Sequence, residues 1–138
     1  MGKIQHWIIF AARLILGLAF IGSGLSKIGA WDATIKFLAS TSIKQAVGSQ
    51  LLPTVAVAMI LIESVGGFFL CLGFRTRLAG GLLAAVLLLS LSFFHDIFTA
   101  SGAIRTDAYL RFLLDSKVLA GLLFVACFGP GKYSVDRG

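Results

Sequence analysis

The stretch LLPTVAVAMILIESVGGFFLCLG, residues 51–73, decides the fold class of this chain. An α-helix of about 20 apolar residues spans the hydrocarbon core of a bilayer. The stretch therefore predicts a transmembrane helix, and its single charged residue, Glu63, lies near the middle. A carboxylate at the bilayer centre costs at least ~2.5–3.5 kcal/mol on insertion scales, so we expect Glu63 to have a partner or a function.

Three further apolar runs of similar length cover residues 4–28, 78–98 and 108–128. The four runs and their loops use the whole chain of 138 residues, which predicts one domain, residues 1–138, folded as an all-α bundle of four transmembrane helices. Composition agrees, because 58% of the residues are hydrophobic, 13% are charged and the mean hydropathy is +0.96. A soluble domain of this size needs a more charged surface.

The net charge of +6 does not indicate nucleic-acid binding, because the basic residues are spread over helix ends. Arg13 interrupts the first run, so we expect a retained helix and not a cleaved signal peptide. Basic residues favour the cytoplasmic side of a membrane. The ends that carry the two termini hold Lys3, Arg75, Arg77, Lys132 and Arg137, and the opposite loops hold Lys36, Lys44 and Arg105, offset by Asp32 and Asp107. We therefore predict a multi-pass protein of the inner (plasma) membrane with both termini in the cytoplasm.

The long connection over residues 29–50 has two interpretations. Its apolar residues Trp31, Ile35, Phe37 and Leu38 would cover one side of a short helix lying at the membrane interface. Alternatively, the segment is a loop that contains some apolar residues.

Polar residues inside the first two runs indicate an internal site. Arg13, Gly17, Phe20, Gly24 and Lys27 recur every three or four residues, so they lie on one helix stripe that should face the bundle interior. The two glycines allow a second backbone to approach closely. Together they predict a packed and charged inner face.

Arg13 and Glu63 are expected at matching depth. Arg13 follows Ile4 by nine residues, and Glu63 precedes Gly73 by ten. At ~1.5 Å per residue, both would lie roughly 14–15 Å from the cytoplasmic side, so an ion pair is predicted. The pair would either fix the register of the helices or belong to a ligand or redox site.

Two later groups add candidates. His95 and Asp96 follow two serines near the end of the third run, where a histidine either exchanges protons or simply hydrogen-bonds water at the headgroups. Arg111 and Asp115 are spaced i, i+4 and can pair on one face of the fourth run, while Lys117 points nearly opposite. We expect the pair to face inward near His95, and Lys117 to meet a partner subunit or a second copy.

No intrinsic cofactor or metal site is expected. Cys71 and Cys127 do not form a CxxC pair, and the two histidines and two cysteines lack ligand spacing. Neither a phosphate-binding loop nor a dinucleotide-binding glycine pattern occurs.

These features resemble the DoxX family of small four-helix membrane proteins. The resemblance rests on RLILGLAFIGSGLSK (13–27), ESVGG (63–67), LGFRTR (72–77), His95, Gly121 and GPGKYSVD (129–136). It implies a four-helix membrane fold, and some relatives belong to quinone-linked oxidoreductases such as thiosulfate:quinone oxidoreductase, while others accompany oxidative-stress proteins. Asp115 and Lys117 depart from the family's pattern, which favours a partner specific to this subfamily.

The leading functional hypothesis is therefore a membrane subunit of a quinone-linked oxidoreductase complex. Arg13 or Lys27 would donate hydrogen bonds to the quinone headgroup, and Glu63, His95 and Asp96 would relay protons. One alternative is a cofactor-free accessory or assembly subunit of a larger membrane complex. The other is a small transporter, although the central Arg13 would repel a cationic substrate.

Overall fold

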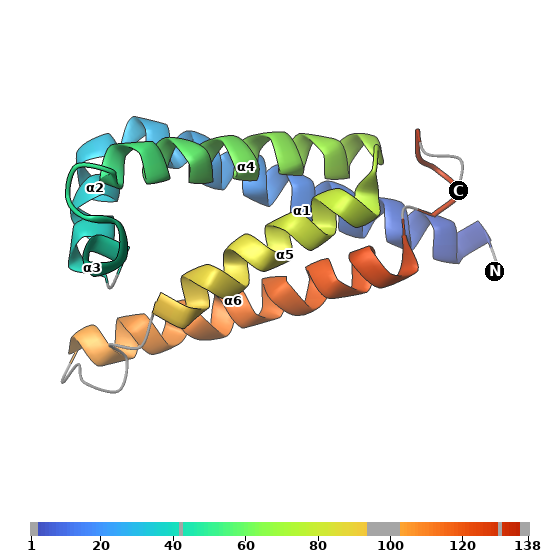
Figure 1. Cartoon of the computed structure of the whole chain (residues 1–138). Coiled ribbons are helices and arrows are strands. Elements are labelled where there is room, and N and C mark those ends of the chain that lie inside the picture. The colour runs from blue at the N-terminus through green and yellow to red at the C-terminus, as the bar shows by residue number, and fades with distance from the viewer. Residues whose placement is uncertain (1–2, 42, 94–102, 130, 136–138) are drawn as a thin grey trace.

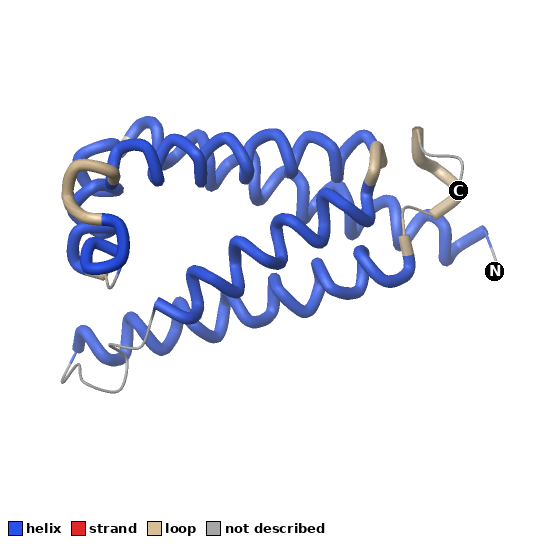
Figure 2. Tube along the Cα trace, viewed as in Figure 1, coloured by secondary structure: helices blue, strands red, loops and turns tan. Residues whose placement is uncertain are grey.

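The computed structural model of the chain describes residues 3–41, 43–93, 103–129 and 131–135. Within these ranges all regular secondary structure is helical, which confirms the all-α class. The helices are α1 (Lys3–Gly29), α2 (Trp31–Ser40), α3 (Ile43–Val47), α4 (Leu52–Leu72), α5 (Thr76–Phe93) and α6 (Ala103–Phe128). Figures 1 and 2 show α1 with α4 as one layer and α5 with α6 as the other.

The four long helices follow the four apolar runs. α1 and α4 end within one residue of their predicted limits, and both are long and apolar enough to cross a membrane. α6 begins at Ala103, five residues earlier than predicted. Its middle carries Arg111, Asp115 and Lys117, so its apolar character is weaker than that of α1 and α4.

The connection between α1 and α4 contains the short helix of the first interpretation, while its position at a membrane interface stays a prediction. Leu38 of α2 is only 2% exposed and packs with Leu52 and Ala56 of α4. The short helix α3, which the sequence did not predict, follows directly. In Figure 1 these two short helices lie at the end of the molecule away from the termini.

Glycines allow α1 to lie directly against α4. A Cβ atom on Gly17 would come within 2.6 Å of the Gly67 carbonyl oxygen, and one on Gly24 would overlap the Ser64 hydroxyl. The predicted stripe of α1 is confirmed, because Arg13, Gly17, Phe20 and Gly24 are all buried. An apolar core that contains Leu83 of α5 and Leu122 of α6 joins this second layer to Phe20 of α1 and Leu70 of α4.

The C-terminal tail, residues 131–135, folds back onto the start of α1. The Tyr133 ring lies 5.2 Å from that of Trp7 between centroids, and Gly131 packs against Ile9. The Val135 amide donates a hydrogen bond of 3.3 Å to the Leu72 carbonyl at the end of α4. Both termini and the α4–α5 turn therefore lie at one end of the molecule (Figure 1).

Candidate functional site

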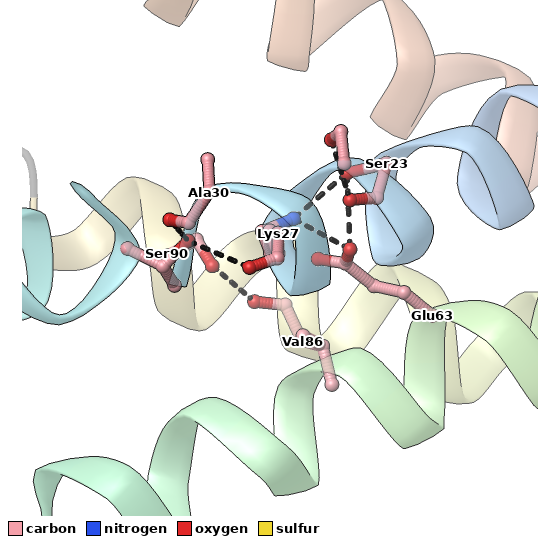
Figure 3. Close-up of polar contacts among 8 residues, drawn as sticks. Ser23, Lys27, Ala30, Glu63, Val86 and Ser90 are labelled. Atoms are coloured by element: carbon pink, nitrogen blue, oxygen red, sulfur yellow. Dashed lines mark hydrogen bonds and ion pairs between the residues drawn. The ribbon is translucent and has the colours of Figure 1, made fainter. Parts of the chain in front are cut away.

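A polar cluster of Ser23, Lys27 and Glu63 joins α1 to α4 (Figure 3). The Lys27 ammonium lies 2.5 Å from the Glu63 carboxylate and donates a second hydrogen bond of 2.7 Å to the Ser23 hydroxyl. That hydroxyl in turn donates to the same carboxylate oxygen at 3.0 Å. The Glu63 side chain is 9% exposed and that of Lys27 is 27% exposed. Each polar group in the cluster therefore has a partner, as buried charge requires.

The cluster lines a cavity of about 340 Å³, called the bundle cavity below. Its size falls at the lower end of the range for small-molecule sites in proteins. The walls come from α1, α2, α4, α5 and α6. The polar lining residues are Ser23, Lys27, Glu63, Ser90, Arg111 and Asp115. The apolar lining residues are Ala19, Phe20, Phe37, Met59, Leu87, Leu114 and Val118.

The charges around the bundle cavity balance. Lys27 and Arg111 supply two positive charges, and Glu63 and Asp115 supply two negative charges. Asp115 interacts favourably with Lys27 and Arg111, and unfavourably with Glu63. Donors and acceptors thus line the same cavity, whose remaining walls are apolar. Such an arrangement suits a neutral ligand with hydrogen-bonding groups better than an ion.

Arg13 does not belong to this cluster, and the predicted Arg13–Glu63 ion pair is wrong. The Arg13 guanidinium is fully buried and donates a hydrogen bond of 2.8 Å to the main-chain carbonyl of Tyr133. It also packs against Gly73, where a Cβ atom would lie 2.8 Å from a guanidinium nitrogen. Its position in the sequence, fourteen residues before Lys27, places it about 21 Å away along α1. Arg13 therefore anchors the tail and does not contact the cavity.

The error arose from the alignment of the two helices. The predicted pair requires the start of α1 to be level with the end of α4. Instead, Gly17 lies against Gly67 and Gly24 against Ser64, which brings Gly73 level with Arg13. The first ten residues of α1 therefore extend beyond the end of α4, where they contact the C-terminal tail.

The other predicted residues divide into three groups. Arg111 and Asp115 line the bundle cavity as expected, and Lys117 is exposed and is not part of its lining. His95 and Asp96 lie outside the described residues. In the part of the chain that is described, no three His, Cys, Asp or Glu side chains gather as metal ligands.

Ser23 is the functional candidate that sequence reasoning missed. The signal was present, because Ser23 precedes Lys27 by one helical turn and therefore shares its face. Ser90 also lines the cavity, and its hydroxyl donates to the Val86 carbonyl at 3.0 Å (Figure 3).

Fold and site together define an all-helical protein with apolar outer faces and a charged internal cavity. The chain belongs to the DoxX family, whose sequence profile matches residues 8–96. It is similar to the inner membrane protein YqjF of Escherichia coli (strain K12), with 31% identity over 99% of this chain and 95% of that protein. The inner membrane protein YphA of the same organism is 25% identical over 99% of this chain and 93% of that protein. No solved structure matches the chain.

Proposed function

We propose that this chain is a multi-pass protein of the inner membrane, with its four long helices spanning the bilayer and both termini in the cytoplasm. Support comes from the two inner-membrane relatives and from the length of α1 and α4. Large apolar side chains such as Ile15, Leu82 and Phe124 also cover the outer faces. The end that holds the termini carries the exposed basic residues Lys3, Arg75, Arg77 and Lys132, as the cytoplasmic side should.

Within this placement, the bundle cavity would bind the headgroup of a quinone, and the chain would serve as a membrane subunit of a quinone-linked oxidoreductase. The observation that carries this proposal is the Ser23–Lys27–Glu63 cluster inside an apolar enclosure. An ammonium has three donors, and the described contacts of Lys27 use two of them. The third is available for a quinone carbonyl oxygen. Arg13, once a candidate donor, is excluded by its distance from the cavity.

Quinone reduction consumes two electrons and two protons. Glu63 and Asp115 line the cavity and are the described groups able to pass protons to the quinone oxygens. The electrons would come from a redox partner, since the sequence contains no motif for a cofactor of its own. The chain would therefore bind and protonate the quinone while another subunit supplies the electrons.

The position of Lys117 favours such a partner. This lysine is exposed near the middle of α6, where a lipid contact would be costly. A symmetric contact between two copies through this face would bring Lys117 against itself. Among the carboxylates of the long helices whose side chains the structure describes, Glu63 and Asp115 both line the cavity. We therefore propose a different membrane subunit that offers a carboxylate to Lys117. The second candidate function is a cofactor-free accessory subunit, and this chain would bind its partner through the same face in that role.

Quinone binding by purified protein tests the main proposal. We expect protein purified in mild detergent from its native membrane to carry extractable quinone, and to bind decylubiquinone when added. Lys27→Met removes the donor and should weaken binding roughly ten- to hundredfold, the worth of a hydrogen bond to a charged group. Lys44→Met is the matched control, because Lys44 is exposed on α3 and does not line the cavity.

One result would favour the accessory role, and another would contradict the proposed headgroup site. Folded wild-type protein that neither contains nor binds quinone while a larger complex co-purifies would favour the accessory role. Equal binding by wild type and Lys27→Met would contradict the headgroup site at Lys27, because it would place the quinone outside the bundle cavity.

A further inference from the structure

The residues that line the bundle cavity are unevenly exposed. Those contributed by α4 and α5 are buried or half-buried: Met59, Glu63, Leu87 and Ser90. The strongly exposed ones come from α1, α2 and α6: Ala19, Phe37, Arg111 and Leu114. Phe37 is 43% exposed and Leu114 is 58% exposed. The cavity therefore opens on the side where α1 faces α6, close to α2.

The packing of the helices explains why the opening lies there. α1 is fixed to α4 by its glycines, and α6 packs closely along α5. Between the two layers, α1 and α6 touch far less than either of these pairs. Leu16 of α1 approaches Gly121 of α6, where a Cβ atom would be in ordinary contact at 3.6 Å. Beyond this contact the layers diverge toward the end that holds α2 and α3 (Figure 1).

The rim of this opening is mainly apolar. Ala19, Phe37 and Leu114 contribute hydrocarbon or aromatic surface, and Arg111 contributes the one charge among the exposed lining residues described. The polar groups Ser23 and Glu63 lie deeper, and Glu63 is almost fully buried. Polarity thus increases from the mouth inward. A ligand that matches this gradient has a polar head and an apolar tail.

We infer that the α1–α6 seam, the opening bounded by Ala19 and Leu114 above the Leu16–Gly121 contact, is a lateral portal from the lipid into the bundle cavity. The inference rests on the proposed function and specifies its ligand class: a lipid-soluble quinone whose tail remains in the seam. The headgroup enters sideways and reaches Lys27. The tail leaves between Ala19 and Leu114 into the bilayer.

Binding of two quinones with the same headgroup, one with a tail and one without, distinguishes an effect on the portal from an effect on the headgroup site. Decylubiquinone carries an apolar tail, and 2,3-dimethoxy-5-methyl-1,4-benzoquinone is the same ring without one. In wild-type protein in nanodiscs we expect both to bind, the tailed quinone more tightly. Ala19→Trp narrows the seam and should lower the affinity for decylubiquinone at least tenfold. It should change the affinity for the tail-less quinone by less than threefold.

Leu18→Trp is the matched control, since Leu18 is adjacent, strongly exposed and absent from the cavity lining. It should change neither affinity. Leu114→Trp repeats the test from the α6 side, so that a folding defect in one variant leaves the other informative. Equal losses for both quinones, or no loss for either, in the folded variants would overturn the portal while the proposed function stands. Failure of wild type to bind either quinone would overturn both.

Discussion

At Glu63 a carboxylate inside an apolar helix is stabilised by one ammonium and one hydroxyl. Both groups come from a single turn of α1, Ser23 and Lys27. Removing one partner of a buried ion pair leaves an uncompensated charge, and this typically costs about 3–5 kcal/mol. The Lys27–Glu63 ion pair therefore stabilises the packing of α1 against α4, and it is also a candidate binding group.

A double-mutant cycle measures the coupling energy between Lys27 and Glu63. Lys27→Met and Glu63→Gln should each lower the free energy of unfolding in detergent, and the double variant should lose less than the sum. We expect a coupling energy of about 1–3 kcal/mol between the two sites. Combining Glu63→Gln with Lys44→Met, which is remote from the cavity, should give additive losses. Additive losses for Lys27 and Glu63 would contradict the ion pair.

Arg13, a fully buried charge of α1, holds the C-terminal tail. Its guanidinium holds the main-chain carbonyl of Tyr133, so Arg13→Met should release the tail. A hydrogen bond to a charged group contributes about 1.5–3 kcal/mol, and its loss should speed tryptic cleavage after Lys132 roughly ten- to hundredfold. Tyr133→Phe retains the carbonyl and the ring, and should cleave like wild type. Unchanged cleavage in Arg13→Met would show that the tail is held by other contacts.

Among the elements, the α1–α4 pair is the most sensitive to added volume. A methyl group on Gly17 would press on the Gly67 carbonyl oxygen at 2.6 Å and the Cys71 sulfur at 2.5 Å. Gly17→Ala should therefore lower the free energy of unfolding by about 1–3 kcal/mol. Gly22→Ala is the control, because nothing lies within 4 Å of its Cβ position. We expect Gly22→Ala to be neutral or slightly stabilising. Equal stability of the two variants in thermal unfolding would contradict the close packing.

The elements were largely predictable, because their signals are local. Apolar run length located α1 and α4 to within one residue, and helical periodicity identified the buried stripe of α1. The partner of Arg13 was not predictable in this way. It depends on how far α1 extends past α4 and on the return of the C-terminal tail, and both are tertiary features. Ser23 shares a helix face with Lys27, so that contact was predictable, but its hydrogen bond to Glu63 of α4 is a tertiary feature.

At the scale of the whole molecule, the distribution of basic residues should set the orientation in the membrane. In a background with Cys71 and Cys127 replaced by serine, we expect an impermeant maleimide to label Lys44→Cys in spheroplasts. Lys3→Cys and Lys132→Cys should react only after permeabilisation, because they lie at the other end. Labelling of either terminal site in intact spheroplasts would contradict cytoplasmic termini.

Association with a partner should depend on Lys117. Lys117→Leu removes the exposed charge from α6 and should reduce the co-purified partner severalfold, while thermal unfolding of the isolated chain stays unchanged. Lys36→Leu, an exposed lysine on α2, is the control. Wild-type protein that remains monomeric when cross-linked in its native membrane would exclude this contact.

The hydrogen bond between Arg13 and Tyr133 joins residues 120 positions apart, almost the full length of the chain. Ribosomes add about 5–20 residues per second, so roughly 6–24 s separate the synthesis of the two groups. With the topology proposed above, α1 would wait in the membrane during this interval before the Tyr133 carbonyl exists, and the long Arg13 side chain would reach toward the headgroups. A nascent chain stopped by a nonsense codon just after α6 would contain every long helix and still lack the Tyr133 carbonyl that Arg13 binds. We expect cellular quality control to remove such a product.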